Sequence, residues 1–119
     1  MNVLIVDDQA VNRLIARTHL ERAGATVEEA ADGPAALARL ASGRFDAVLL
    51  DVGLPGMGGA EVCAAVRAEP RLAGLRVLAW TAGDEDALGA LLAAGFDGLL
   101  AKPLRRDALL AALGLAPPG

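Results

Sequence analysis

The sequence predicts an α/β fold, a doubly wound five-stranded parallel β-sheet with helices on both faces. Three observations predict it. Short apolar runs alternate with amphipathic stretches along the chain, which is typical of repeated βα units. The strongest runs show little polar alternation, as expected for strands that are covered on both faces. The length of 119 residues is enough for one domain with one core.

The five predicted strands are short and mostly apolar. They lie at 2–7, 26–30, 46–51, 76–81 and 97–101. The second is the weakest, because Glu28 and Glu29 interrupt it, and we expect it at an edge of the sheet. Five βα units in a doubly wound sheet favour the flavodoxin-like strand order 2-1-3-4-5, a (βα)5 three-layer sandwich. In that order, ligands bind between the carboxyl ends of the first and third strands.

The amphipathic stretches predict helices near 10–23, 34–41, 59–68, 85–94 and 104–113. Gly24 follows the first helix at a position that favours a left-handed backbone. Pro34 fits the first turn of the second helix, where a missing N–H costs little. Gly89 costs the fourth helix about 1 kcal/mol relative to Ala, so we expect that helix to be the least stable. We expect one domain over 1–115, with 116–119 as a tail or the start of a linker.

Composition excludes several classes of protein. Hydrophobic residues make up 55% of the chain and aromatic residues only 3%, so Ala, Leu and Val must fill a globular core. The net charge of −4 argues against a nucleic-acid-binding domain, which normally carries a basic face. No apolar run approaches the roughly 20 residues that cross a bilayer, and no signal-peptide pattern is present. With a single cysteine, Cys63, the sequence predicts a cytoplasmic protein without membrane insertion.

Polar residues follow four of the predicted strands at the point where each strand ends. Asp7 ends the first and Asp8 follows it, Asp51 ends the third, Thr81 ends the fourth and Lys102 follows the fifth. Because the carboxyl ends of parallel strands share one edge, we expect these side chains to form one site. Two carboxylates 4 Å apart repel by about 4 kcal/mol at an effective dielectric constant of 20, so three of them need a cation. Oxygen ligands favour Mg²⁺, and no His and Cys cluster offers a competing zinc site.

The central position of Asp51 makes it the best candidate for a phosphoryl acceptor, since aspartate carboxylates can act as nucleophiles. Thr81 can donate a hydrogen bond to a phosphoryl oxygen, and Lys102 brings a positive charge from the other side. The simpler interpretation is that these are solvated acids and strand-end residues, which are common when they occur singly.

The motifs around these residues are VLIVDD at 3–8, ADG at 31–33, DVGLPGMGG at 51–59, TA at 81–82 and LAKP at 100–103. In this order and spacing, the chain resembles the receiver domain of two-component response regulators over essentially its full length. The segment 8–13, DQAVNR, is most similar to receivers of hybrid kinases and phosphorelays.

The resemblance implies a phosphoacceptor that is not a turnover enzyme. Asp51 would be phosphorylated, in a Mg²⁺-dependent reaction, by a histidine kinase or a histidine phosphotransfer protein. Asp8, Asp51 and the backbone carbonyl of Gly53 would bind the ion directly, and Asp7 mainly through water. Phosphorylation would change contacts with a downstream protein through the face formed by the fourth helix, fifth strand and fifth helix.

The same resemblance assigns roles to the remaining strand ends. Thr81 would be the switch hydroxyl. Lys102 would contact the phosphoryl group, and the peptide bond from Lys102 to Pro103 would be cis. Cis bonds are found in about 5–6% of X–Pro pairs in general.

Four positions depart from the family pattern. Leu99 stands where members often have an aromatic residue, so we do not expect the usual aromatic readout. Gly53 and Gly83 flank the path of an attacking water, and their lack of side chains predicts a short-lived phosphorylated form; the alternative is that they serve only loop flexibility. Trp80 replaces an aliphatic residue, and we expect it to lie in the core and to report ligand binding by fluorescence.

Other residues have simpler interpretations. His19 lies on what we expect to be the inward face of the first helix, with Asn12, Ile15, Ala16 and Ala23, so we expect it to be partly buried with its hydrogen bonds satisfied. Cys63 should be a small core residue. Val11 and Leu14 lie off that face and could dock a phosphodonor helix, or be ordinary surface residues.

Two rival functions remain open. An aspartate-nucleophile phosphatase of the haloacid dehalogenase type would have a second Asp two residues after the nucleophile, where this chain has Gly53. A flavodoxin-type module would have a phosphate-binding loop after the first strand, where Asp7 and Asp8 would repel the flavin phosphate. Turnover of a phosphomonoester or flavin colour would identify these two.

Overall fold

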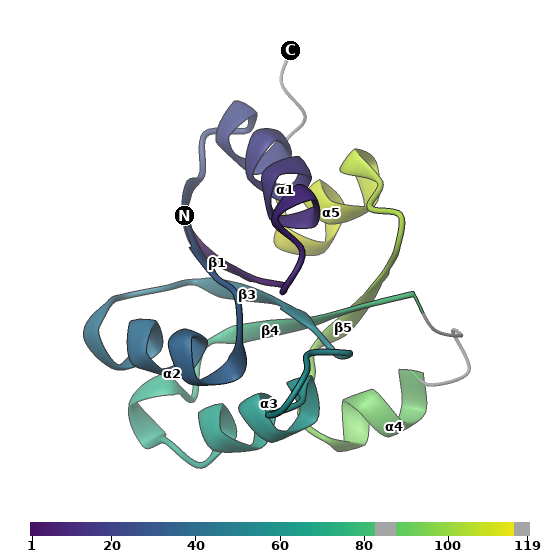
Figure 1. The fold of residues 1–119 in the computed structure, drawn as a ribbon. Helices are drawn as coiled ribbons and strands as arrows, with labels where there is room; N and C mark the ends of the chain where they lie inside the picture. The colour runs from purple at the N-terminus through teal and green to yellow at the C-terminus, as the bar shows by residue number, and fades with distance from the viewer. Residues whose placement is uncertain (83–87, 116–119) are drawn as a thin grey trace.

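The computed structural model describes residues 1–82 and 88–115, which form a three-layer α/β/α sandwich (Figure 1). The strands are β1 (Asn2–Val6), β2 (Thr26–Ala30), β3 (Ala47–Asp51), β4 (Arg76–Thr81) and β5 (Gly98–Ala101). The helices are α1 (Ala10–Arg22), α2 (Gly33–Ser42), α3 (Gly59–Arg67), α4 (Leu88–Ala93) and α5 (Arg106–Leu113), with a short 3-10 helix, η1 (Pro70–Leu72). All pairings are parallel and the strand order is β2-β1-β3-β4-β5, so the predicted fold class is confirmed.

The sheet separates two apolar clusters. Helices α1 and α5 cover one face and α2, α3 and α4 cover the other (Figure 1). Strand β3 contributes to both clusters and is buried along its whole length: Val48 and Leu50 pack on the α2–α4 side, Ala47 and Leu49 on the α1 and α5 side. Full burial of one Leu side chain stabilises a fold by roughly 1.5–3 kcal/mol. The central strand that carries Asp51 is therefore held rigidly from both sides.

Local sequence signals set the helix boundaries. The Asp32 carboxylate accepts a hydrogen bond from the Ala35 amide (2.8 Å) and caps α2, whose first turn contains Pro34 as predicted. Gly24 follows α1 with φ of +92°, the predicted left-handed backbone. The predicted first turn of the fourth helix and the tail at 116–119 lie outside the described residues. None of the helices in the described ranges is long and apolar enough to cross a bilayer.

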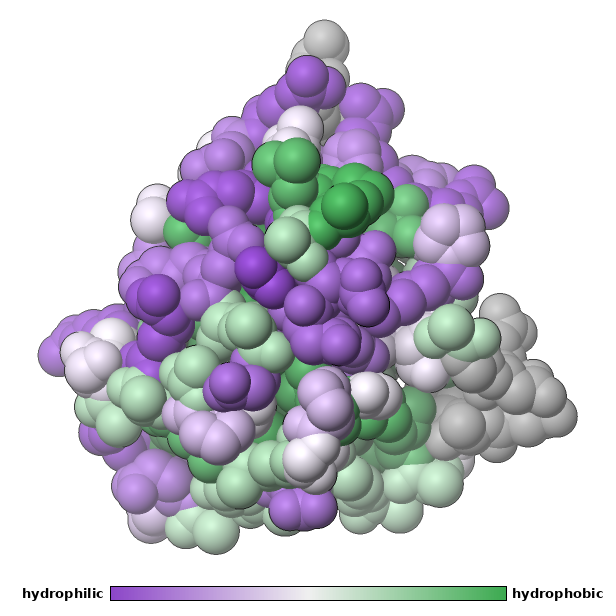
Figure 2. Space-filling view, in the orientation of Figure 1, coloured by the Kyte–Doolittle hydropathy of each residue, from purple (hydrophilic) through white to green (hydrophobic). Residues whose placement is uncertain are grey.

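Helix α1 exposes apolar side chains near the carboxyl edge of the sheet. Val11, Leu14 and Ile15 are 67%, 62% and 41% exposed. Figure 2 shows a compact hydrophobic group over α1, surrounded by hydrophilic side chains. The prediction that Val11 and Leu14 lie off the inward face is confirmed, but the placement of Ile15 on that face is wrong. The buried stripe of α1 runs through Ala16 and Leu20, which are four residues apart. Ile15 lies beside this stripe and not on it.

Two further residues test the core prediction. Cys63 is fully buried in the cluster beneath α2–α4, as predicted. His19 is half-buried, as predicted, but its Nδ1 atom is buried with no hydrogen-bond partner among the described residues, so the prediction of satisfied hydrogen bonds is wrong. His19 directly precedes Leu20, which is fully buried, and the backbone carbonyls of both residues accept a hydrogen bond from the Ala23 amide within the helix.

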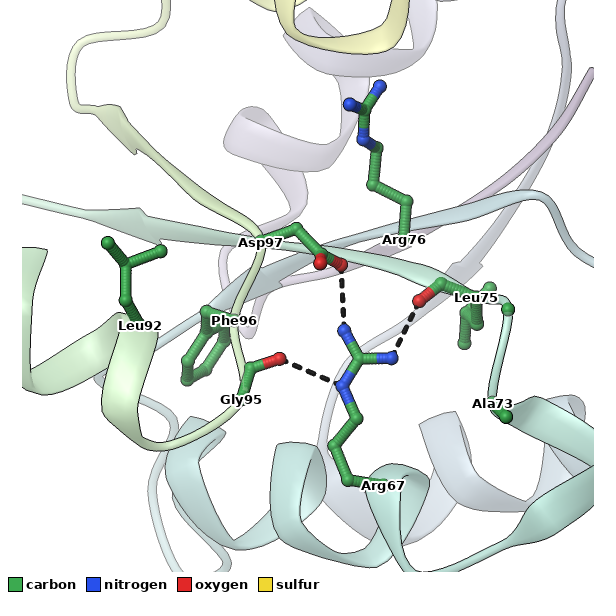
Figure 3. Close-up of a pocket in the computed structure, with 9 residues that line it drawn as sticks. Arg67, Ala73, Leu75, Arg76, Leu92, Gly95, Phe96 and Asp97 are labelled. Atoms are coloured by element: carbon green, nitrogen blue, oxygen red, sulfur yellow. Dashed lines mark hydrogen bonds and ion pairs between the residues drawn. The ribbon is translucent and has the colours of Figure 1, made fainter.

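At the amino edge of the sheet, opposite the predicted site, Arg67 joins three segments of the chain. Its guanidinium donates to the carbonyls of Gly95 and Leu75 (both 2.8 Å) and pairs with the carboxylate of Asp97 (2.7 Å), as Figure 3 shows. These bonds line a hollow of about 520 Å³, and the side chain of Arg76 points away from them to the carbonyl of Ala112. Each nitrogen of the Arg67 guanidinium thus has a partner. We interpret the hollow as a structural contact between α3 and the segments that precede β4 and β5.

We predict that Arg67→Met lowers the free energy of unfolding by about 2 kcal/mol, because two partly buried carbonyls lose a charged donor. Urea unfolding measures this. Arg39→Met is the matched control, since the ion pair of Arg39 with Glu28 (2.7 Å) is about half exposed on both sides and should contribute about 0–1 kcal/mol. Equal losses in the two variants would contradict the assignment.

Candidate phosphoacceptor and metal site

The structure brings the predicted strand-end residues together at the carboxyl edge of the sheet. One carboxylate oxygen from each of Asp7, Asp8 and Asp51 lies within 4.8 Å of the others. The Lys102 ammonium lies 2.8 Å from Asp7 Oδ2 and 3.4 Å from Asp51 Oδ2. Thr81 ends β4 at the same edge, and its carbonyl accepts a hydrogen bond from the Lys102 amide (2.9 Å). The parallel topology therefore places three acids and one base in a single small volume.

Asp7 is the most firmly held of the three acids. Its residue is 0% exposed, and both carboxylate oxygens accept hydrogen bonds: Oδ1 from the Gln9 amide (2.8 Å) and Oδ2 from Asn12 Nδ2 (3.3 Å). With Lys102 it has three donors, so the buried carboxylate is satisfied. Asp8 is exposed and, within the described ranges, its side chain makes no hydrogen bond or ion pair. It is the acid most available to a ligand.

Asp51 is the last residue of β3 and is 5% exposed. Its Oδ1 accepts a hydrogen bond from the Gly53 amide (2.9 Å), so the loop that follows the strand orients the carboxylate. Gly59 brings the start of α3 against this loop: a Cβ atom there would lie 2.7 Å from the Asp51 carbonyl oxygen and 2.8 Å from Val52 Cα. The glycine of the GMGG segment is thus needed for close packing behind Asp51.

Lys102 follows β5, and its peptide bond to Pro103 is cis, as the resemblance implied. The lysine side chain is 20% exposed. Burial disfavours its charge, but the hydrogen bond to Asp7 and the charge of Asp51 outweigh that effect, so the pKa of Lys102 is raised. The side chain therefore carries a full positive charge across the neutral pH range and offsets part of the acidic cluster.

The residues present suit Mg²⁺. The donor set is made of hard carboxylate oxygens with no sulfur or imidazole among them, and one acid is open to solvent. Net charge supports the same conclusion, since one ammonium faces three carboxylates and two formal negative charges remain. A divalent cation matches that excess.

Two contributors were missed by the sequence analysis, which placed Asn12 only on a helix face. Asn12 bonds to Asp7, and Arg13 donates to the Asp7 carbonyl (2.8 Å) while pairing with Glu29 of β2 (2.9 Å). Burial opposes the charge of Glu29, but Arg17 and Arg13 outweigh it and lower its pKa. The signal was available in the NR pair of the DQAVNR segment, one helical turn after the acids. Lys102 also lies over the ring of Trp80, a contact that no sequence pattern indicated.

The chain is similar to known signalling proteins. The family model of the response regulator receiver domain matches residues 3–114. The sensor histidine kinase AruS of Pseudomonas aeruginosa is 45% identical over 119 residues, which cover 96% of this chain and 12% of AruS. The chemotaxis protein CheY of the same organism is 40% identical, with 92% of this chain and 90% of CheY covered. The sensor protein ArcB of Escherichia coli is 38% identical, with 93% and 14% covered. The chain spans only a small part of the two sensor kinases.

Solved structures agree with this assignment. The chemotaxis response regulator CheY4 of Vibrio cholerae superimposes with a TM-score of 0.89 at 36% identity, covering 95% of both chains. A putative response regulator from Chloroflexus aurantiacus gives a TM-score of 0.89 at 35% identity, covering 94% of this chain and 93% of that one. Fold, motifs and family match together establish that the chain belongs to the response regulator receiver family, the receiver domains of two-component signalling.

Proposed function

We propose that the chain accepts a phosphoryl group on Asp51 in a Mg²⁺-dependent reaction and signals by changing its contacts with other proteins. One observation carries this proposal. Oxygens of Asp7, Asp8 and Asp51 lie within 4.8 Å of one another, and the Lys102 ammonium bridges two of these acids. Such a cluster is costly to fold without a ligand, and a phosphoryl group with its cation uses every member of it.

The transfer itself would require little of the protein beyond positioning. The donor is a phosphohistidine of a histidine kinase or a histidine phosphotransfer protein. Its N–P bond breaks as an O–P bond forms to the Asp51 carboxylate, the electron pair returns to the imidazole nitrogen, and a proton from solvent neutralises the ring. Asp51 is already oriented by the Gly53 amide (2.9 Å), so its approach to the donor is set before the donor binds.

Asp8, Asp51 and the backbone carbonyl of Gly53 would hold Mg²⁺ directly, with Asp7 acting mainly through water. When bound, the ion supplies positive charge that offsets both the acids and the incoming phosphoryl oxygens. The Lys102 ammonium lies 3.4 Å from Asp51 Oδ2. It would exchange this contact for one with a phosphoryl oxygen.

The switch begins with the added charge. Phosphorylation adds about −1.5 to −2 charges and three acceptor oxygens beside Asp51. The Thr81 hydroxyl would donate to one of these oxygens, and its strand is tied to Lys102 through the backbone bond from the Lys102 amide (2.9 Å). A displacement of Thr81 or of Lys102 would therefore be transmitted to the other residue through this bond.

The contact surfaces follow from the exposed apolar side chains. We assign the phosphodonor to α1, where Val11 and Leu14 are exposed close after the acids (Figure 2). We assign the downstream protein to the face of α4, β5 and α5, as the resemblance implies; Leu92 of α4 is 49% exposed but lines the hollow beside Arg67. Leu99 of β5 is half-buried against the cluster beneath α2–α4, so readout there would depend on helix movement instead of an aromatic side chain.

Signalling accounts for these residues better than catalysis of turnover. Gly53 lacks the second carboxylate that an aspartate-nucleophile phosphatase uses, and Asp7 and Asp8 lie where a flavin phosphate would bind. We accordingly propose a non-enzymatic module, working in the cytoplasm where its phosphodonors act, over a domain of 1–115 with 116–119 as tail or linker.

We predict that beryllofluoride, which mimics a phosphoryl group, binds the wild-type chain only when Mg²⁺ is present. Trp80 is the single tryptophan, so its fluorescence reports the titration directly. Asp51→Asn removes the acceptor and should abolish the change. Asp46→Asn is the matched control, because Asp46 is exposed and bonds to the Asn2 amide (2.7 Å) at the opposite edge of the sheet. Binding to the Asp51 variant with wild-type affinity would refute the proposal.

A second prediction concerns the lifetime of the phosphorylated form. A Cβ atom on Gly53 would meet only Asp51 Oδ1, at an ordinary contact distance of 3.6 Å, so a larger side chain fits there. We predict that Gly53→Gln slows loss of the phosphoryl group several-fold by covering the path of the attacking water. Gly83, the other glycine in this hypothesis, lies outside the described residues.

The decay is followed by intact mass after acetyl phosphate is removed. Gly74→Gln, in a loop where a Cβ would meet nothing within 4 Å, is the matched control and should leave the rate unchanged. If both variants decay as fast as the wild type, Gly53 serves only the loop conformation and the hypothesis fails.

A further inference from the structure

Trp80 lies in the core next to the acidic site. It lies in β4 directly before Thr81 and is 1% exposed. The Lys102 ammonium lies over its ring, 4.9 Å from the ring centroid. A cation within about 6 Å of a tryptophan ring face is attracted by the electron density of that face, and the attraction strengthens when both partners are shielded from water.

The register of the sheet explains how a core residue reaches the site. Trp80 pairs with Leu100 of β5, and both pack in the apolar cluster under α1 and α5. Lys102 follows β5 two residues after Leu100, and its ammonium lies over the ring. The indole ring thus presents an apolar surface to one side of the ammonium.

The ammonium has three neighbours in the site. Asp7 Oδ2 lies 2.8 Å away, Asp51 Oδ2 lies 3.4 Å away, and the ring occupies a third side. The carboxylate contacts are directional, whereas attraction to the ring face is spread over the whole ring. Lys102 can therefore exchange one oxygen for another while it stays over the ring.

We propose that Trp80 is a positioning residue for Lys102: its ring keeps the ammonium beside Asp51, where it meets the phosphoryl group. This rests on the proposed function of Asp51 as acceptor. The indole Nε1 is buried without a hydrogen-bond partner in the described part of the chain, so the ring face, and not the N–H group, makes the useful contact. Phenylalanine should then replace Trp80 in this role, and leucine should not.

The first test is a double-mutant cycle without Mg²⁺, using the wild-type chain, Trp80→Leu, Lys102→Met and the double variant. Trp80→Leu should lower the folding equilibrium constant roughly 2- to 10-fold more when Lys102 is present than when it is Met. Val3→Ala is the control, because Val3 is buried in the same cluster at the far end of the sheet, and its effect should be the same in both backgrounds. Additive effects of Trp80→Leu and Lys102→Met would overturn the proposal.

The second test measures beryllofluoride affinity with Mg²⁺ by ¹⁹F NMR, which does not need the tryptophan. Trp80→Leu should weaken binding roughly 2- to 10-fold and Trp80→Phe should restore most of the loss. Wild-type affinity in Trp80→Leu, or equal losses in the two variants, would overturn the positioning role. If the wild-type chain itself fails to bind, the proposed function is wrong, and the metal-free cycle still decides whether the ring holds the ammonium.

Discussion

The ion pair of Lys102 with Asp7 and Asp51 is the interaction on which the rest of the site depends. A parallel sheet in the order β2-β1-β3-β4-β5 forces the ends of β1 and β3 together, and this chain places an acid at each end. At an effective dielectric constant of 20, one such pair at 4 Å costs about 4 kcal/mol, a large fraction of the stability of a small domain. Lys102 follows β5 and contacts both acids, so it offsets part of that repulsion. An excess of negative charge remains. The residual negative charge favours a cation at this edge.

The three acids differ in burial and in the hydrogen bonds of their carboxylates, and we infer a separate role for each. Asp7 is buried and fully hydrogen-bonded, so it serves as the fixed anchor for Lys102. Asp51 is oriented by the Gly53 amide but keeps only a longer contact with the ammonium. Asp8 faces solvent. A ligand that arrives at this edge therefore meets one exposed acid and one oriented acid, while the third holds the base in place. The fold keeps this arrangement because β1 and β3 are buried on both faces.

The parts of the fold that depend on simple periodicity could be predicted from the sequence. Apolar runs located the strands to within one residue or so, and alternation with helices determined the parallel order. Strand ends then indicated Asp7, Asp51 and Lys102 as neighbours, because topology alone brings them together. Ile15 was misplaced, since the buried stripe of α1 is narrow and uses Ala16 and Leu20.

Contacts between side chains from distant segments could not be predicted. The three bonds of Arg67, the donation of Arg13 to the Asp7 carbonyl and the position of Lys102 over Trp80 all depend on rotamers. A one-dimensional pattern contains no such information. The His19 nitrogen that has no hydrogen-bond partner among residues 1–82 and 88–115 is another example, because burial of one atom depends on the local packing and not on the helix face.

The most direct measurement is chemical mapping of the phosphorylated residue. The chain is treated with acetyl phosphate and Mg²⁺, reduced with borohydride to convert any acyl phosphate into the corresponding alcohol, cleaved with trypsin and sequenced by mass spectrometry. We predict a single change, at Asp51, within the peptide 45–67 that follows Arg44. A change at Asp7, Asp8 or Asp46 in place of Asp51, or an unmodified chain, would contradict it.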